Sequence, residues 1–260
     1  MATLKNSNAG LPHEFSETLK IGVLGAGAFG TSMAAACSRK GHNVILWARD
    51  AEQVKTINET RRNPKYGMDA FELLDNLKAT NNLEEACKNA DILFLALPAQ
   101  RIPQFCKDHG ALIDPKTIIC NTAKGLYVPT QQLLSEAVLE ALERPEQPYA
   151  TLSGPSFALE IMQGMPTAVV VASKLLYNAV TIQRAMSTLK FRVYSSQDLV
   201  GVQLGGALKN PLAIGAGMIE GCGYGMNTLS AYVTRSAAEL RSLCIAMGGH
   251  PDTVTGLSGV

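Results

Sequence analysis

The chain lacks the features that mark several large functional classes. Its 260 residues include only 17% charged residues, 6% aromatic residues and one tryptophan, and the formal net charge is +1. A nearly balanced charge gives no strong electrostatic attraction to nucleic acid or to an anionic membrane surface. No apolar stretch is long enough and free enough of polar residues to span a bilayer. We therefore expect no nucleic-acid partner and no insertion into a membrane.

Residues suited to metal binding or hydrolysis are scarce as well. Four histidines are scattered through polar contexts, and the six cysteines never form a Cys-x-x-Cys pair. Because these spacings do not fit zinc-binding patterns, we expect no metal site. The chain has no Gly-x-Ser-x-Gly and no Gly-x-x-x-x-Gly-Lys segment, so hydrolase and NTPase functions have no support. Dispersed cysteines are typical of reduced, mostly buried thiols, and we expect a cytoplasmic location.

The length and the hydrophobic content support a sizeable core. With 47% hydrophobic residues over 260 positions, one large or two modest domains are expected. Residues 1–19 are polar and lack the apolar core of a signal peptide, so we interpret them as a flexible extension. The alternative is a remnant of an organelle-targeting segment, although the arginine-rich character of a transit peptide is missing.

The segment from Ile21 to Thr31 is the most informative in the chain. An apolar run leads directly into Gly25-Ala26-Gly27-Ala28-Phe29-Gly30, and an alanine-rich helical pattern follows. In such a loop the first glycine permits a tight turn, the second lets a pyrophosphate approach the backbone, and the third allows close helix–strand packing. The helix N-terminus then offers free N–H groups to phosphate. The pattern predicts dinucleotide binding, and the alternative is a glycine-rich turn in another β–α unit.

Apolar runs of strand length alternate with helical patterns over the first three quarters of the chain. This alternation predicts an α/β fold with a parallel, doubly wound sheet of the Rossmann type. The expected strands cover 20–25, 43–47, 77–80, 91–97, 117–121, 150–152, 167–171 and 191–194. The expected helices between them cover 31–40, 51–59, 83–89, 102–107, 130–142, 157–163 and 175–187.

The composition changes after about Ser195, where glycine- and alanine-rich helical segments at 199–217 and 228–247 replace the strands. We therefore predict a dinucleotide-binding domain over 20–195 and the first part of an all-helical domain over 196–260. Pro211 falls inside the first of these helical segments, where it should kink the helix or leave a carbonyl without its amide donor.

Arg49 lies just beyond the second expected strand, where an acidic residue often binds the ribose 2′-hydroxyl of NAD. An arginine at this point can contact a 2′-phosphate through a forked, charge-assisted hydrogen bond, which predicts that NADP is accepted or even preferred. The alternative is that Arg49 is solvated in a loop while Asp50 caps the next helix.

Two further segments follow expected strands and should lie at the same edge of the sheet. Lys124 precedes Gly125 after one strand, and Ser153-Gly154-Pro155-Ser156 follows another. Ligands of open α/β sheets bind outside the carboxyl ends of the strands, so Lys124 and the backbone of the second segment can reach a ligand there. The alternatives are a surface lysine at a turn and a serine that caps a helix.

Lys209 occurs in the apolar, small-residue segment Gly205-Gly206-Ala207-Leu208-Lys209-Asn210. A partly buried ammonium needs a partner or a lowered pKa, which is how lysines come to act as acids and bases. We therefore regard Lys209 as a candidate catalytic residue.

Taken together, these motifs resemble the soluble, bacterial-type NAD(P)-dependent glycerol-3-phosphate dehydrogenases. The resemblance covers about residues 20–260, and its specific parts are Ser153-Gly154-Pro155-Ser156-Phe157-Ala158 and Gly206-Ala207-Leu208-Lys209-Asn210. It implies a Rossmann domain followed by an all-helical domain with the site between them. It also implies hydride exchange between dihydroxyacetone phosphate and sn-glycerol 3-phosphate with NAD or NADP, a step that feeds glycerolipid synthesis.

The resemblance also implies roles for individual residues. Lys209 and Lys124 correspond to catalytic residues, with Lys209 exchanging the proton at the C2 oxygen. The implied substrate contacts are Lys124, Gly154, Ser156, Lys209 and Asn210. The implied cofactor contacts are Gly25, Gly27, Ala28, Phe29, Gly30, Arg49, Lys124 and Ala158.

The chain departs from the family pattern near its last residue. The family continues Gly256-Leu257-Ser258-Gly259 with an aspartate that partners the catalytic lysine and an Arg-Asn pair that holds phosphate. The resemblance therefore implies a C-terminally truncated chain, and a homodimer when the protein is full length. The alternatives are an inactive dinucleotide-binding fragment and a related hydroxy-acid dehydrogenase. Smaller departures are Asn227-Thr228-Leu229, where the family has Asn-Ala-Arg, and Pro211, where a β-branched residue is common.

Overall fold

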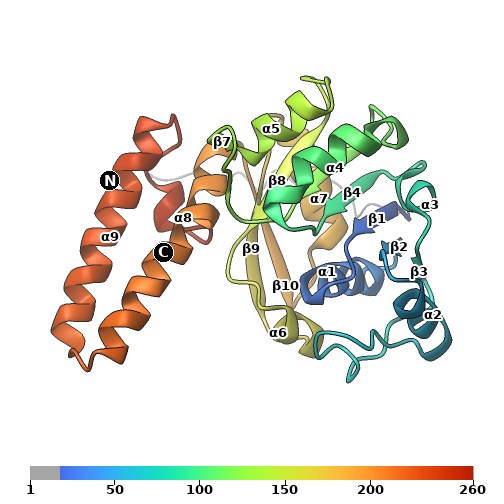
Figure 1. Ribbon diagram of the computed structural model, residues 1–260, viewed down its shortest axis with the longest axis horizontal. Helices are drawn as coiled ribbons and strands as arrows, with labels where there is room; N and C mark the ends of the chain where they lie inside the picture. Colours follow the sequence, from blue (N-terminus) through green and yellow to red (C-terminus); the bar gives the residue numbers. More distant parts are fainter. Residues whose placement is uncertain (1–17, 260) are drawn as a thin grey trace, which may run out of the picture.

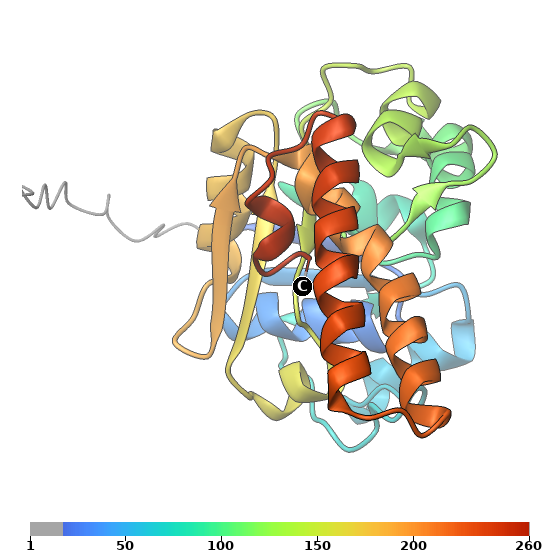
Figure 2. The same ribbon diagram turned by 90° about the vertical axis from the view of Figure 1, so that its left-hand side faces the viewer.

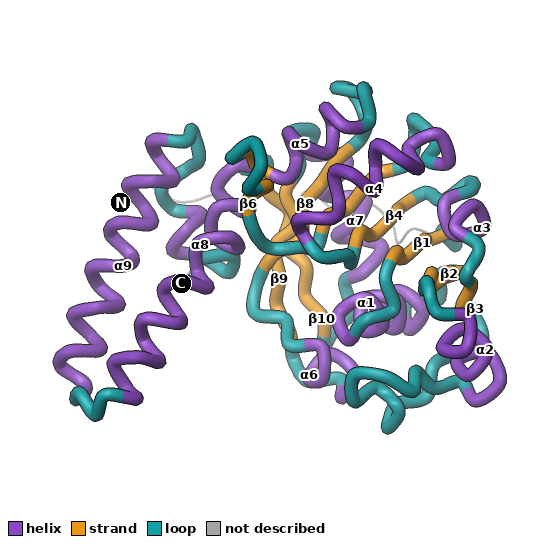
Figure 3. The backbone as a smooth tube through the Cα atoms, in the orientation of Figure 1, coloured by secondary structure: helices purple, strands orange, loops and turns teal. Residues whose placement is uncertain are grey.

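A computed structural model of the chain describes residues 18–259, so the expected extension over 1–19 lies almost entirely outside the described residues. The described part forms one twisted sheet with helices on both faces, and a helical hairpin projects from one side of it (Figures 1 and 3). The sheet strands are β1 (Lys20–Leu24), β2 (Asn43–Trp47), β3 (Leu77–Thr80), β4 (Ile92–Leu95), β5 (Ile118–Asn121), β8 (Tyr149–Ser153), β9 (Thr167–Ala172) and β10 (Phe191–Ser196). The helices are α1 (Ala28–Arg39), α2 (Ala51–Thr60), α3 (Leu83–Cys87), α4 (Ile102–His109), α5 (Leu134–Ala141), α6 (Ala158–Gln163), α7 (Leu176–Met186), α8 (Leu199–Gly221) and α9 (Met226–Ala246).

All eight expected strands are present, in the order β10-β9-β8-β5-β4-β1-β2-β3. From β3 to β8 every neighbouring pair is parallel. The chain winds outward from β1 to β3 and then returns to β4 on the other side of β1, which creates a switch point between β1 and β4. The expectation of a Rossmann-type, doubly wound sheet is therefore confirmed for these six strands.

The expectation of a fully parallel sheet is wrong at one end, because β9 pairs with β8 in the antiparallel direction. The connection between them contains only the short helix α6, which has six residues. Ser153, the last residue of β8, pairs with Val170, so β9 begins beyond the carboxyl end of β8 and runs back along it. Strand β10 then pairs with β9 in parallel.

Alternating side chains of the central strands belong to two separate hydrophobic clusters. Ile92 and Phe94 of β4 pack on the face covered by α1, α6 and α7, whereas Leu93 and Leu95 pack on the face covered by α3, α4 and α5. This period of two explains why the run reads as continuously apolar, since both faces of a central parallel strand are buried. The rigid sheet fixes the loops at the carboxyl ends of its strands.

Helices α8 and α9 form the antiparallel hairpin seen at the left of Figure 1 and side by side in Figure 2. The first third of α8, from Leu199 to Gly206, is buried against the sheet, and the remainder extends away from it. The helix continues through Pro211 without interruption, so the carbonyl of Ala207 lacks the amide donor that a residue other than proline would supply. The hairpin thus carries Lys209 at the point where α8 leaves the sheet.

The expected helix over 130–142 begins later than the pattern indicates. Residues Gln132–Leu133 form a short strand, β7, that pairs with β6 (Leu126–Tyr127), and α5 begins only at Leu134. Gln131 takes a left-handed conformation with φ of 58°, which ends any helical path before it. The carboxylate of Glu136 accepts the Leu133 N–H and so defines the start of α5.

Five of the six cysteines are buried and none is disulfide-bonded, as expected, and only Cys222 is exposed. Burial raises the pKa of Cys37 and of Cys106 to about 12 and that of Cys87 to about 11. Above pH 9 the unfolded chain therefore loses thiol protons that the folded chain keeps, so the free energy of unfolding falls as pH rises. Each such thiol lowers the free energy of unfolding by about 1.4 kcal/mol per pH unit in this range.

We expect denaturant midpoints to drop steeply between about pH 9 and pH 11. Urea titrations at several pH values measure this dependence. Cys37→Ala should make the drop shallower, whereas Cys222→Ser should leave it unchanged because that thiol is already exposed in the folded state. An equally steep drop in both variants would show that other groups control the alkaline transition.

Candidate active site

The three loop glycines meet three different spatial demands. Gly25 has a φ of +114°, and a Cβ there would overlap the carbonyl of Ala96. A Cβ on Gly30 would overlap the carbonyl oxygen of Gly25, so only glycine allows α1 to pack this closely on the turn after β1. At Gly27, by contrast, nothing lies within 4 Å of where a Cβ would be. The loop is therefore tightly packed at Gly25 and Gly30 and free of neighbouring protein atoms at Gly27.

The N-terminus of α1 faces this open side without a protein group that neutralises it. Gly27 is the N-cap residue, no side chain caps the helix, and its first turn contains no acidic residue. The first N–H groups and the positive end of the helix dipole thus remain available to an anion. Ala28 and Phe29 form the first turn and are partly exposed. The geometry suits a phosphate at this helix end.

Arg49 follows β2 and is exposed, and none of the hydrogen bonds or ion pairs of the described residues involves it. Asp50 is engaged elsewhere. Its carboxylate caps α2 by accepting the N–H of Glu52, and it forms an ion pair with Lys65 that, together with these backbone hydrogen bonds, lowers its pKa. The expected cap is therefore present, and Arg49 remains unpaired beside it.

A cavity of 250 Å³ lies at the carboxyl edge of the sheet, next to the start of α1. Four separate segments line it: the start of α1, the two residues that follow β4, the loop after β5, and the loop after β8. The lining residues are Phe29, Ala96, Leu97, Thr122, Ala123, Lys124 and Ser156. The cavity thus lies beside the switch point between β1 and β4, and Lys124 forms part of its wall.

Lys124 extends from the loop after β5 toward the loop after β8. Its ammonium donates a 3.4 Å hydrogen bond to the carbonyl oxygen of Gly154, and the hydroxyl of Ser156 donates to the same oxygen at 3.1 Å. Ser156 does not cap α6, whose N-cap residue is Phe157. The two strand-end segments that the sequence singled out therefore meet at Gly154.

Helix α8 brings Lys209 to the same place. A Cβ on Gly206 would lie 2.7 Å from the Ser153 hydroxyl and 3.7 Å from Cγ of Lys124, and Lys209 follows one turn later in α8. The pKa of Lys124 is lowered, first by desolvation from the surrounding protein and then by the positive charge of Lys209. Two ammonium groups from different elements thus share one site.

Other expected site residues lie further out. Asn210 is exposed on α8, and Ala158 is partly exposed at the start of α6. No group of three or more histidine, cysteine, aspartate or glutamate side chains gathers within residues 18–259 in a way that suits a metal ion. In the same range, no helix has the length and apolar character needed to cross a membrane.

Ser153, the residue just before Gly154, lies at the site although no role was predicted for its side chain. The residue is 4% exposed, and its hydroxyl has no hydrogen-bond partner within the described part of the chain. It lies against Gly206 at the junction of β8 and α8. The sequence places Ser153 at the end of an expected strand and in the segment that carries the resemblance, but neither feature shows that its side chain meets α8.

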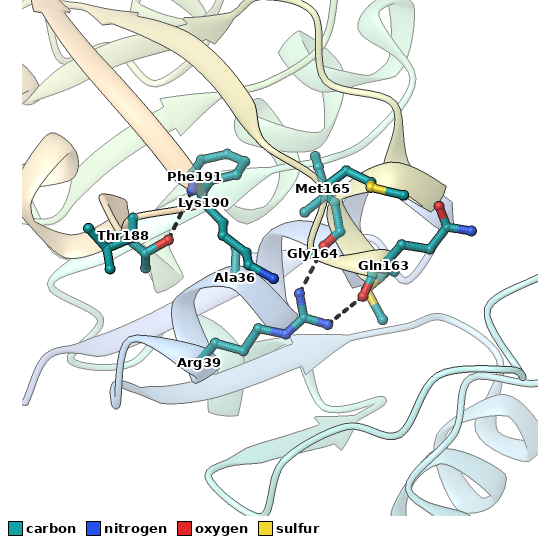
Figure 4. Close-up of a pocket in the computed structure, with 11 residues that line it drawn as sticks. Ala36, Arg39, Gln163, Gly164, Met165, Thr188, Lys190 and Phe191 are labelled. Atoms are coloured by element: carbon teal, nitrogen blue, oxygen red, sulfur yellow. Dashed lines mark hydrogen bonds between the residues drawn. The ribbon is translucent and has the colours of Figure 1, made fainter.

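A larger cavity of 540 Å³ lies away from this edge, between α1, α6 and the start of β10 (Figure 4). Arg39 is one of its polar lining residues and donates to the carbonyls of Ile161 and Met162 at 2.8 and 2.7 Å. These bonds satisfy carbonyls at the C-terminal end of α6, so the guanidinium ties α1 to α6. We assign this cavity to the packing of those helices.

The contact of Gly206 with Ser153 leads to a testable difference between two glycines of α8. We expect Gly206→Ala to push α8 away from β8 and to lower stability by about 1–2 kcal/mol. Gly217→Ala should instead raise stability by about 0.5–1 kcal/mol, because nothing lies within 4 Å of that position. Thermal unfolding of both variants measures the effects, and equal shifts would contradict the close packing at Gly206.

Comparisons with known proteins agree with this geometry. Residues 20–179 match the family model described as the NAD-dependent glycerol-3-phosphate dehydrogenase N-terminus, and residues 198–260 match that of its C-terminus. A glycerol-3-phosphate dehydrogenase (NAD(P)+) of Clostridium botulinum is 42% identical over 241 residues, which cover 93% of this chain and 72% of the relative. The Brucella canis enzyme of the same name is 44% identical, with 93% and 73% covered. A crystal structure of glycerol-3-phosphate dehydrogenase from Coxiella burnetii superposes with a TM-score of 0.85 at 33% identity, again covering 93% of this chain and 73% of the other.

Proposed function

The chain belongs to the NAD-dependent glycerol-3-phosphate dehydrogenase family, and from this premise we propose how its site works. The reaction is the interconversion of dihydroxyacetone phosphate and sn-glycerol 3-phosphate with NAD or NADP. The observation that carries the assignment to this edge of the sheet is the convergence of Lys124 and Lys209 beside the glycine loop. Both ammonium groups lie where a ligand of an open α/β sheet is expected.

The glycine loop fits a dinucleotide pyrophosphate. The space above Gly27 is free, and the uncapped N-terminus of α1 offers N–H donors without a competing carboxylate. We assign cofactor contacts to Gly25, Gly27, Ala28, Phe29, Gly30, Arg49, Lys124 and Ala158. When bound, the nicotinamide supplies or accepts the hydride. The remaining tasks are to orient the ketone, stabilise charge on its oxygen and move one proton.

The two lysines divide these tasks. As hydride reaches C2 of the ketone, negative charge develops on the C2 oxygen, and the Lys124 ammonium stabilises that charge more in the transition state than in the ground state. Lys209 donates a proton to the same oxygen, and in the reverse direction its neutral amine removes the proton. Gly154, Ser156 and Asn210 complete the proposed substrate contacts.

The domain arrangement follows the same logic. We assign residues 20–195 to cofactor binding and residues 196–260 to the first part of a helical substrate domain, with the site at their junction.

We further propose a cytoplasmic homodimer with a small phosphorylated substrate, in which the product feeds glycerolipid synthesis. Light scattering on the purified protein tests the oligomeric state.

The direct test is oxidation of NADH and of NADPH with dihydroxyacetone phosphate. Turnover with this substrate, and none with 2-keto acids of similar size, supports the proposal. Turnover only with a keto acid would favour a hydroxy-acid dehydrogenase. Dinucleotide binding without any turnover would identify the chain as a binding fragment and overturn the catalytic assignment for it.

Arg49 should influence which dinucleotide is used. We expect Arg49→Ala to lower the ratio of kcat/KM for NADPH to that for NADH by about tenfold or more, because a forked contact to the 2′-phosphate is lost. Lys55→Ala provides a control, since Lys55 is another exposed cation, on the adjacent helix α2. An unchanged ratio in Arg49→Ala would show that Arg49 is only a solvated loop residue.

A further inference from the structure

We propose that Gln53 and Asn63 are positioning residues that turn the N–H of Gly27 toward the pyrophosphate of the bound dinucleotide. This inference rests on the proposed function, because it concerns how the glycine loop is prepared for its ligand. Neither residue belongs to the glycine motif. Gln53 lies in α2, and Asn63 lies in the loop that follows it.

The two side chains converge on one carbonyl of the loop. The carbonyl oxygen of Ala26 accepts a hydrogen bond from Nε2 of Gln53 at 2.8 Å and another from Nδ2 of Asn63 at 3.1 Å. Gln53 is 6% exposed and Asn63 is completely buried. Two buried amide donors therefore hold the peptide between Ala26 and Gly27 in one orientation.

The orientation of that peptide decides where the Gly27 N–H points. In a planar trans peptide, the C=O and the following N–H point in opposite directions. Since the Ala26 carbonyl is held toward the buried amides, the Gly27 N–H faces the opposite, open side of the loop. None of the hydrogen bonds of the described residues uses this N–H as a donor, and the space beside Gly27 is empty of protein.

The amides are themselves held in place. Nε2 of Gln53 also donates to Oδ1 of Asn63 at 2.9 Å, and Nδ2 of Asn63 donates to the hydroxyl of Thr31 at 2.7 Å. The backbone N–H of Lys65 donates to Oδ1 of Asn63 at 3.1 Å. The network thus connects α1, α2 and the loop after α2, and it restrains both amides beside the Ala26 carbonyl.

This restraint on the peptide between Ala26 and Gly27 matters because the loop is rich in glycine. Glycine backbones sample more conformations than those of other residues, so an unsupported Gly25-Ala26-Gly27 turn would have to be ordered each time the cofactor binds. Holding the peptide in its binding orientation beforehand lowers that cost. The prediction is a loss of affinity that is confined to ligands with a pyrophosphate.

The experiment compares Asn63→Ala with Asn58→Ala. Asn58 is also a side chain of this region, and it makes two similar hydrogen bonds to the backbone of Ala79, but it does not contact the glycine loop. Dissociation constants are measured for ADP-ribose, which contains the pyrophosphate, by calorimetry, and for adenosine, which lacks it, by ligand-observed NMR. Gln53→Met is a second variant of similar shape, in case Asn63→Ala does not fold.

We expect Asn63→Ala and Gln53→Met to bind ADP-ribose about tenfold more weakly, with adenosine affinity changed less than about twofold. The KM for NADPH should rise while kcat at saturating cofactor stays near that of the wild type. Equal losses for both ligands, or an equal loss in Asn58→Ala, would indicate general destabilisation and overturn the inference. Failure of the wild type to bind ADP-ribose would instead contradict the proposed function, so the two failures are distinguishable.

Discussion

Replacing Lys209 by alanine is expected to lower kcat by about 10³-fold while the dissociation constant for NADPH changes by less than about twofold. Two effects add in the lost turnover, because the substitution removes both the proton donor at the C2 oxygen and one of two charges that stabilise it. Cofactor affinity should persist because the glycine loop and the N-terminus of α1 lie on other elements. Stopped-flow turnover and fluorescence titration with NADPH measure the two quantities.

Lys209→Arg separates the two contributions. It keeps the positive charge, but a guanidinium is too weak an acid to give up a proton near neutral pH. We expect the arginine variant to recover only a small part of the lost rate if proton transfer dominates. Lys190→Ala is a matched control, because Lys190 is an exposed lysine at the other cavity. Near-wild-type turnover in Lys209→Ala would refute the catalytic role.

The same substitution should change the ionisation of Lys124. In the folded protein the pKa of Lys124 is lowered first by desolvation and second by Lys209. Removing Lys209 removes a like charge, so the pKa of Lys124 should rise toward its ordinary value without reaching it. The pH dependence of amine modification, followed by mass spectrometry at Lys124, measures the direction. A lowered or unchanged pKa would mean that the two ammonium groups do not interact in solution.

Much of the fold was predictable because its strongest determinants are local. The eight sheet strands are short apolar runs bounded by turn residues, and all eight form. The direction of β9 was not predictable from periodicity, because alternation of side chains is the same for parallel and antiparallel pairs. It depends on the path of the connection through α6, which the pattern of apolar residues does not define.

The site was predictable only where its residues lie in recognisable strand-end motifs. Lys124 and Gly154 follow strands that are neighbours in the sheet, so their approach follows from the topology. The two amide hydrogen bonds to the Ala26 carbonyl were not predictable, since their donors lie 27 and 37 residues away along the chain. Gln53 and Asn63 look like ordinary polar residues of a helix and a loop. Only the tertiary structure brings them to the same carbonyl.

The second large effect is expected from alanine substitutions at two glycines of one loop. One should lower dinucleotide affinity, and the other should lower stability. Gly27→Ala should fold and lose at most about 1 kcal/mol of stability, because alanine is a poorer N-cap than glycine, whereas the space around that position is free and its φ of −74° suits any residue. Its dinucleotide affinity should fall by about 100-fold, since the new methyl group occupies the space that the pyrophosphate needs. Urea titration and calorimetry with NADPH measure stability and affinity separately.

Gly30→Ala should instead act on the folded state itself. Its new methyl group would overlap the carbonyl oxygen of Gly25 and lie 3.1 Å from Cβ of Ala96. Relieving that overlap requires α1 to move away from the turn after β1, which should cost about 3 kcal/mol of stability or prevent folding. If Gly27→Ala were the destabilised variant and Gly30→Ala the stable one, the loop would not have the orientation described. The contrast therefore tests the placement of α1 against the sheet, from which both the phosphate site and the position of Phe29 in the cavity wall follow.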